Sequence, residues 1–567
     1  MKLNIFHYLL VIIACVSACS ETTDVNEITL IKGGKTYGGE VKFTSSDKVQ
    51  SLFPLSVIDK YSFRITGQVF ESLVKIEPST SEVIPVIAES FKVNNAGDVY
   101  TFKIRSGIYF HEDECFEDET RELTTEDVKY SLEFACSGLK LNTVNSLVSH
   151  IKGAQSFYES TSSTLSKKGV SGIKIKGGNT IEISLNKPFV GFEKILSQQN
   201  IVIFPKEAYE KYKEDISKHP VGTGPFKLES STDKGIRLIR NDNYWRKDDF
   251  GNQLPYLGAI SIDYSNGAKN EMLAFRSSEI DILMEIPVEE LENVLGTLQE
   301  AKDGKNVKHK VESANSISTE YIGFNHSSEL FSKKEVRLAI LYAIDHSKLI
   351  DKQLNGEGNA PTNGFIPVIE GQGNEINMPG ANIEKAKSLL ASAGYPNGDG
   401  FPKMDIYVNS TKGSRIHRLM EGVVKELKTN LNIDFSIKLC DYQQREAAIL
   451  SGEAQIWRAG WIADYPDPQS FLSILYGGGM TKNQFQIANH AFDHNYDAAM
   501  VELNPEKRSK LLLNCAQQVM DEAFIVPLMN DNMLIMVNAR VKGLTANSME
   551  LLDFTEVFIK EPKATSL

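Results

Sequence analysis

The sequence predicts an α/β protein made of two or three domains. Short strand-like runs alternate along the chain with amphipathic segments of about 12 to 20 residues, an order typical of α/β folds. No period of about 20 to 50 residues repeats, which argues against solenoids and propellers. At 567 residues the chain is too long for a single hydrophobic core.

Residues 1–18 have the pattern of a secretory signal peptide: a basic start, the apolar run Phe6–Val16, and small residues before Cys19. The run is shorter than the roughly 20 residues of a membrane-spanning helix. The four residues ending at Cys19 (Val-Ser-Ala-Cys) resemble the bacterial lipobox, whose Cys is acylated. We therefore expect lipidation at Cys19, a tether over 19–27, and a periplasmic or cell-surface location. Ser20 leaves open which membrane holds the anchor.

The strands are predicted from two patterns. Apolar and polar residues alternate with period two in some runs, and others are apolar throughout, as in fully buried strands. The predicted strands are Val99–Arg105, Thr180–Leu185, Ile456–Gly460, Phe524–Leu528 and Met533–Val537.

The helices are predicted from their apolar faces and caps. Thr124 is expected to cap one helix, and Ser332 with Glu335 forms the pattern of a capping box. Gly394 is expected to end another. The other predicted helical segments are Ile383–Ala393, Ile416–Leu427 and Pro505–Glu522.

One domain boundary is suggested where the character of the chain changes. The polar stretch Ala301–Ser318 precedes the strand-like Glu320–Asn325, a candidate crossover between two lobes. A return near residues 525–532 would complete the pair of crossovers.

Composition and motifs argue against several functions. The formal net charge is −13, and no basic stripe with interleaved aromatic residues is present, so nucleic-acid binding is not expected. We found no Ser-hydrolase elbow, P-loop or zinc-protease motif. Gly222–Pro225 lacks a following helix, and the acidic run after His111 is interpreted as a solvated loop. We therefore predict no enzyme activity, no cofactor and no metal.

The cysteines leave two alternatives open. Cys115, Cys136, Cys440 and Cys515 have no metal-ligand spacing. Outside the cytoplasm an even set suggests disulfides, with nearness in sequence favouring 115–136 and 440–515. Four buried thiols are the equal alternative.

Motifs in order along nearly the whole chain resemble the family 5 extracellular solute-binding proteins, the receptors of oligopeptide and dipeptide ABC importers. Each motif is weak alone, but their number and order are specific. The motifs are Gln68–Val74, Tyr100–Arg105 followed by Phe110-His111, Thr125–Ser131, Gly222–Phe226, Asn243–Trp245, Gly251–Leu257, Phe275–Asp281, Val336–Asp345 and Ala393–Pro396.

The resemblance implies a two-lobed, type II periplasmic-binding-protein fold with an extra domain inserted in the first lobe. The implied first lobe comprises 28–70, 197–316 and 530–567, the extra domain 71–196, and the second lobe 317–529. It also implies a peptide ligand and the membrane subunits of an ABC importer as partners. We expect a monomer.

The richest candidate site lies in Ile456–Pro468, where a predicted strand runs into a loop. Ligands of α/β proteins bind beyond the carboxyl ends of strands. A peptide carries an ammonium and a carboxylate, and burying either one unpaired is costly. The resemblance implies that Asp464 pairs with the ammonium and that Arg458 meets the carboxylate of short peptides. The alternative for each is a structural salt bridge, and the ligand role is favoured.

Three further residues complete the predicted site. His417 falls where some relatives use a His for the carboxylates of longer peptides, although an exposed helix His is the favoured interpretation. Trp461 is a candidate floor for a side-chain pocket, although core packing is favoured. Ile58 stands where some relatives carry a Glu, and Asp59 is a candidate substitute. The alternatives are a nickel complex, haem or oligosaccharide as ligand, a hydrolase, or a surface lipoprotein outside transport.

Overall fold

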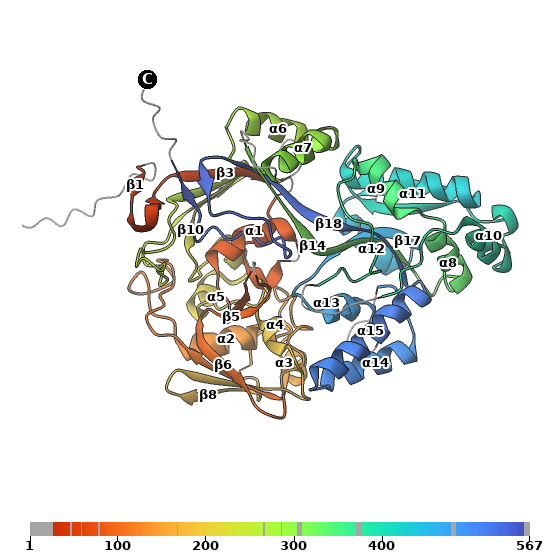
Figure 1. The fold of residues 1–567 in the computed structure, drawn as a ribbon. Helices are drawn as coiled ribbons and strands as arrows, with labels where there is room; N and C mark the ends of the chain where they lie inside the picture. Colours follow the sequence, from red (N-terminus) through yellow and green to blue (C-terminus); the bar gives the residue numbers. More distant parts are fainter. Residues whose placement is uncertain are drawn as a thin grey trace, which may run out of the picture.

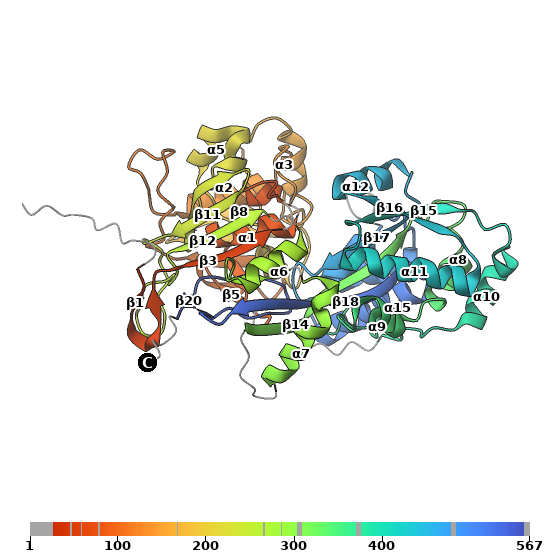
Figure 2. The ribbon, with the colours of Figure 1, turned by 90° about the horizontal axis from the view of Figure 1, so that it is seen from above.

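The structure, a computed structural model, describes residues 27–560 apart from 46–47, 58, 78–79, 167, 265–266, 285, 303–308, 370–375 and 478–483. Two α/β lobes lie side by side, joined by the long strands β14 (His309–Phe324) and β18 (Ile525–Asn538) (Figures 1 and 2). Cys19 and Ile58, which were singled out from the sequence, lie outside the described residues. No helix within the described residues is long and apolar enough to cross a membrane.

A single ten-stranded mixed sheet runs through both lobes, because β14 and β18 pair with strands on either side. On the first-lobe side of β18, the strands in spatial order from the outer edge of the sheet are β10 (Phe226–Thr232), β11 (Gly235–Arg240), β12 (Ala259–Tyr264), β3 (Glu40–Ser45) and β13 (Ile282–Leu283). On the second-lobe side of β14, the strands are β17 (Ile456–Ile462), β15 (Met404–Asn409) and, at the other edge of the sheet, β16 (Phe435–Cys440).

The two connecting strands change partners at the junction of the lobes. In the first lobe, β14 residues 309–315 pair with β18 residues 532–538, and β18 also pairs with β13. In the second lobe, 319–323 pair with 525–530, and β14 also pairs with β17. The ladder is irregular between Asn315 and Thr319. The polar stretch expected to separate two units is therefore largely part of one long strand, and the two predicted late strands are one strand, β18.

The first lobe also holds small antiparallel sheets. The largest consists of β6 (Ala88–Val93), β7 (Val99–Ile104), β9 (Thr180–Ser184) and β8 (Ile173–Gly177), within the range expected for the extra domain. The pairs are β1 (Thr29–Leu30) with β2 (Thr36–Tyr37), β4 (Val74–Ile76) with β5 (Val83–Pro85), and β19 (Val541–Lys542) with β20 (Phe558–Ile559).

Helices surround the sheets in both lobes (Figure 1). The first lobe carries α1 (Lys60–Val69), α2 (Thr125–Ala135), α3 (Ala154–Ser160), α4 (Phe192–Leu196), α5 (Lys206–Tyr212), α6 (Ala268–Arg276) and α7 (Leu291–Lys302). The second carries α8 (Lys334–Tyr342), α9 (His346–Leu354), α10 (Ile383–Ser392), α11 (Arg415–Leu431), α12 (Tyr442–Ser451), α13 (Pro468–Leu472), α14 (His490–Val501) and α15 (Pro505–Asp521).

The caps test the helix predictions. Thr124 is the N-cap of α2, as expected, and the structure shows that it forms a capping box with Asp127. The predicted box at Ser332 is wrong, because α8 has Lys333 as its N-cap. The Ser332 hydroxyl instead donates to the Glu329 carbonyl oxygen at 3.1 Å, within the preceding turn.

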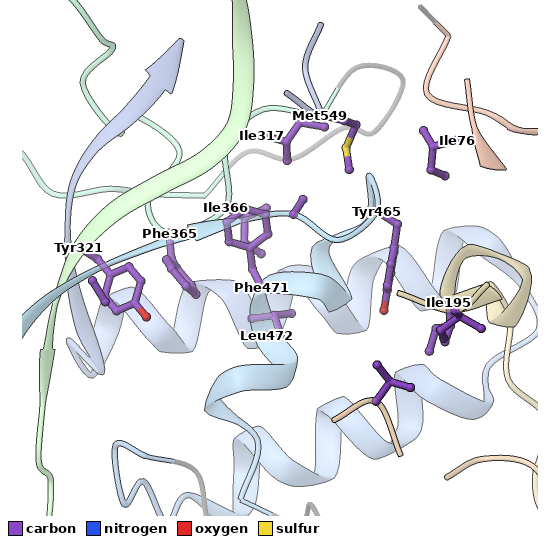
Figure 3. Packing of buried hydrophobic residues seen from close by; sticks show 14 of the residues in the cluster. Ile76, Ile195, Ile317, Tyr321, Phe365, Ile366, Tyr465, Phe471, Leu472 and Met549 are labelled. Atoms are coloured by element: carbon purple, nitrogen blue, oxygen red, sulfur yellow. The ribbon is translucent and has the colours of Figure 1, made fainter. Parts of the chain in front are cut away.

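One buried apolar cluster extends across both lobes. Figure 3 shows part of it, with Ile76 and Ile195 from the first lobe and Tyr465 and Phe471 from the second. Burial of about 25 cal/mol per Å² of apolar surface is the main favourable term that holds such a cluster together.

Candidate functional site

The loop that follows β17 is held by hydrogen bonds at both ends. The Ala463 N–H donates to the Ile317 carbonyl oxygen at 2.8 Å, and the Asp464 N–H donates to the Ser470 hydroxyl at 2.9 Å. Asp467 caps α13 by accepting from the Gln469 N–H. These bonds place the Asp464 side chain just beyond the carboxyl end of β17, as the sequence predicted.

Asp464 reaches from the second lobe into a cavity of about 120 Å³ whose other lining residues belong to the first lobe. They include Gly67 of α1, Gln199, and Leu551 and Asp553 near the C-terminus. The cavity therefore lies between the lobes, and Asp464 is the part of its lining that the second lobe supplies.

The Asp464 carboxyl has an unusual environment. Its side chain is exposed to the space of the cavity, but the two lobes that enclose the cavity displace bulk water around it. This desolvation raises its pKa to about 7, and the hydrogen bond with Ser470 opposes the shift only in part. None of the described cations forms an ion pair with it, so a positive charge brought by a ligand would stabilise the ionised carboxylate.

Lys194 links the lobes next to this loop. Its ammonium on α4 lies 3.0 Å from the carboxylate of Asp467, which also receives a two-pronged contact from Arg508 on α15. Burial alone would raise the pKa of Asp467, but the two cations outweigh it and bring the pKa to about 2. Asp467 is 1% exposed, so its carboxylate is shielded from solvent, whereas Lys194 is half-buried.

Arg458 forms a salt bridge within the protein, which was the alternative to a ligand-binding role. It is buried on β17, its guanidinium forms an ion pair with Glu320 of the neighbouring strand β14, and it donates to Asn409 Oδ1 at 3.2 Å. Gly460 makes room for this pair, because a Cβ there would lie 2.8 Å from Glu320 Oε1. Burial raises the pKa of Glu320, and the attraction of Arg458 opposes that shift. In this structure Arg458 is therefore already engaged by a protein carboxylate.

A second, larger cavity of about 490 Å³ lies along the junction of the lobes. Its second-lobe wall contains Arg415, which forms ion pairs with Glu357 and Asp531. These two carboxylates raise the pKa of Arg415, against the opposing effect of its desolvation. Glu550 from the C-terminal segment lines the same cavity and accepts from the Ser316 hydroxyl at 2.6 Å.

The sequence reasoning missed this group. Its members are far apart along the chain and share no motif. One sequence feature could have pointed to these residues, namely charged residues beside or within apolar strands. Examples are Glu320 before Tyr321–Phe324 and Asp531 within β18.

Other predicted residues are placed differently from expectation. His417 is 9% exposed rather than an exposed helix residue, and its Nδ1 accepts from the Gly413 N–H, which ties it to the turn that begins α11. Asp59 caps α1, accepting from the N–H and the hydroxyl of Ser62 at 2.8 Å each. Trp461 is half-buried on the sheet face opposite Arg458, beside Thr319.

The four candidate disulfide cysteines, Cys115, Cys136, Cys440 and Cys515, are free thiols in this structure. Of the two alternatives that the sequence left open, the structure has free thiols and not the disulfides, although Cys115 and Cys440 are only half-buried. Cys136 and Cys515 are buried, and desolvation raises the pKa of the Cys515 thiol to about 12, which makes it unreactive. Within the described ranges no cluster of three His, Cys, Asp or Glu side chains is arranged to hold a metal ion.

Comparison with known proteins agrees with this architecture. The haem-binding protein A of Haemophilus influenzae is 26% identical over 540 residues, covering 93% of this chain and 94% of the relative. The peptide transport periplasmic protein SapA of Haemophilus influenzae is 23% identical over 529 residues, covering 88% and 89%.

A solved structure, the ABC transporter-associated periplasmic binding protein DppA from Helicobacter pylori in complex with peptide STSA, matches with a TM-score of 0.78 at 24% identity. The match covers 93% of this chain and 99% of that one, and it confirms the predicted two-lobed periplasmic-binding-protein fold. The bounds of the inserted domain stay a prediction. The model of the bacterial extracellular solute-binding proteins, family 5, matches residues 82–483, and the chain belongs to that family.

Proposed function

We propose that this solute-binding protein captures short peptides between its lobes and delivers them to the membrane subunits of an ABC importer. It acts outside the cytoplasm, held at a membrane by acyl chains on Cys19, and it catalyses no reaction. The observation that carries the peptide assignment is the environment of the Asp464 carboxyl. This carboxyl is exposed to an interlobe cavity, and its desolvation there raises its pKa to about 7. The relative SapA, named for peptide transport, supports the same assignment.

The α-ammonium of a peptide supplies the charge that Asp464 lacks. An ionised carboxylate in a partly desolvated site is unfavourable until a cation joins it, and hydrogen bonds between charged groups are about twice as strong as neutral ones. Because most of the cavity lining belongs to the first lobe, a peptide held by Asp464 contacts both lobes and favours their closed arrangement.

The strand before Asp464 offers backbone groups for the rest of the peptide. β17 pairs with β14 along residues 456–462, but with β15 only at Trp457 and Arg458. The edge of β17 from Ala459 to Ile462 thus pairs on one side only. An extended ligand adding to such an edge is held by main-chain hydrogen bonds, which tolerate many side chains.

The test is calorimetric titration of the purified protein with tri- to pentapeptides and with their N-acetylated counterparts. We expect binding of the free peptides and at least a 30-fold weaker affinity after acetylation, because acetylation removes the ammonium. Equal affinity for both forms, or no binding of any peptide, would refute the proposal. Mass spectrometry of the recovered peptides should show them intact, and cleavage would indicate a hydrolase instead.

Haem is the second candidate ligand, because a curated relative that matches nearly the whole chain is named for haem binding. An absorbance titration with haemin separates the two. A saturable Soret shift together with no peptide binding would favour haem.

A further inference from the structure

The larger interlobe cavity holds cations that its own carboxylates do not neutralise. Its described lining includes five cations (Lys60, Arg64, Lys269, Lys412 and Arg415) and four carboxylates (Glu289, Glu357, Asp531 and Glu550), which leaves one net positive charge.

The carboxylates are already committed to particular partners. Arg415 takes both Glu357 and Asp531. Glu289 contacts Arg418 at 2.8 Å and lies 3.9 Å from Lys269. The excess positive charge of the lining therefore lies at the cations that these carboxylates do not pair with.

Arg64 and Lys412 form no ion pair with a described carboxylate. Arg64 is a half-buried residue of α1 in the first lobe, and its guanidinium lies 5.5 Å from the centre of the Tyr61 ring. Lys412 is exposed in the loop before α11 in the second lobe. The two residues line one cavity from opposite lobes. Two positive charges on opposite lobes repel each other as the lobes close. An anion bound between them attracts both and so favours the closed arrangement.

We propose that this cavity binds a carboxylate of the ligand between Arg64 and Lys412. The assignment rests on the proposed peptide-binding function and names where the negative end of the ligand sits. A planar carboxylate accepts from a guanidinium fork and from an ammonium at once. Because one cation comes from each lobe, the contact forms only in the closed arrangement and stabilises it.

A single negative charge suits this cavity better than a phosphate. The net lining charge is one, and Glu357 and Asp531 stand in the same wall, so a dianion would meet additional repulsion. Burial raises the pKa of Glu357, the Arg415 cation opposes that shift, and the nearby Asp531 carboxylate adds to it. Arg458, engaged by Glu320, is not the group that receives this carboxylate.

The spacing of the two cavities fits one ligand. Helix α1 lines both, through Lys60 and Arg64 in the larger cavity and through Gly67 in the Asp464 cavity. Arg64 and Gly67 are three residues apart, or about 4.5 Å along the helix axis at about 1.5 Å per residue, so the two cavities open close to each other along α1. An extended peptide advances about 3.4 Å per residue, so a peptide of a few residues is long enough to reach from one cavity into the other.

The experiment compares tetra-alanine with a free carboxyl terminus, its C-terminal amide, and the amide of Ala-Ala-Ala-Glu, each by calorimetry. With the unmodified protein we expect the tetra-alanine amide to bind at least tenfold more weakly than the free acid. In Arg64→Met and in Lys412→Met the ratio between acid and amide should fall below threefold. Lys425→Met, on the exposed face of α11 and outside both cavities, is the matched control and should keep the full ratio.

The outcomes separate this proposal from the function on which it rests. Equal binding of acid and amide by the unmodified protein, or an unchanged ratio in both variants, overturns the carboxylate site. The ammonium test by N-acetylation would still decide whether peptides bind. Recovery of affinity by the glutamate-containing amide identifies an acidic side chain as a carboxylate source, and no recovery identifies the terminal carboxylate. Lys412 is exposed, so Lys412→Met keeps the test valid if Arg64→Met fails to fold.

Discussion

Lowering the pH from 7 to 5 is expected to weaken peptide binding about 50-fold through Asp464. Its raised pKa of about 7 means that half of the free protein carries a protonated carboxyl at pH 7 and about 99% does at pH 5. Only the ionised form pairs with an ammonium. Binding must then release a proton, and the apparent dissociation constant scales as one plus the ratio of protonated to ionised Asp464, roughly 2 at pH 7 and roughly 101 at pH 5.

The assay is calorimetry with tetra-alanine, whose own groups keep their charges over this range because their pKa values are about 8 and about 3.5. Asp464→Asn should flatten the pH profile. It should also weaken binding at pH 8 by about 30- to 100-fold, equivalent to about 2 to 3 kcal/mol, the lower part of the range for losing one partner of a charged pair because the side chain is partly solvated.

Asp405→Asn is the matched control. It removes the same charge from an exposed residue of β15 in the same lobe, outside both cavities, and should leave the pH profile intact. A dissociation constant that changes less than threefold between pH 7 and pH 5 would refute the reasoning. Retention of the full pH dependence in Asp464→Asn would do so as well.

Three other substitutions test separate features. Cys19→Ser should release the protein from the membrane fraction and abolish labelling with a palmitate analogue; continued membrane association would contradict the lipid anchor. Lys194→Ala breaks the interlobe pair with Asp467 while Arg508 keeps that carboxylate partnered, so peptide should dissociate about fivefold faster with no loss of thermal stability. An unchanged off-rate would count against it. Glu320→Gln leaves the Arg458 cation buried without its partner and should lower the free energy of unfolding in urea by about 3 kcal/mol. A change below about 1 kcal/mol would show that Arg458 finds another partner.

The elements with strong local signals were predicted well. The alternating run that became β7 and the cap of α2 at Thr124 depend on neighbours within a few residues. The position of Asp464 also follows from local order, because a strand followed by a Pro-rich loop places it beyond the strand end. The false capping box at Ser332 shows the limit, since the same residues begin the helix one position later when the preceding turn takes the hydroxyl.

The partners of the predicted site residues could not be read in the same way. Arg458 and Glu320 meet because β17 and β14 lie side by side in a particular register, which no motif encodes. His417 lies on an amphipathic helix, but its burial depends on how the turn before α11 folds back over it. The cysteines show the same limit, because an even number of thiols says nothing of the distances between them.

By itself the sequence determined the α/β class, the order of the elements and the identity of the residues at the end of β17, because hydrophobic period, caps and motifs act over short stretches of chain. Only the tertiary structure decided which charges neutralise each other. Arg415 and Asp531 are 116 residues apart, and they meet because β18 passes between the lobes beside α11. Among the described residues, the structure also leaves Asp464 without a paired cation in one interlobe cavity, and Arg64 and Lys412 without a paired carboxylate in the other.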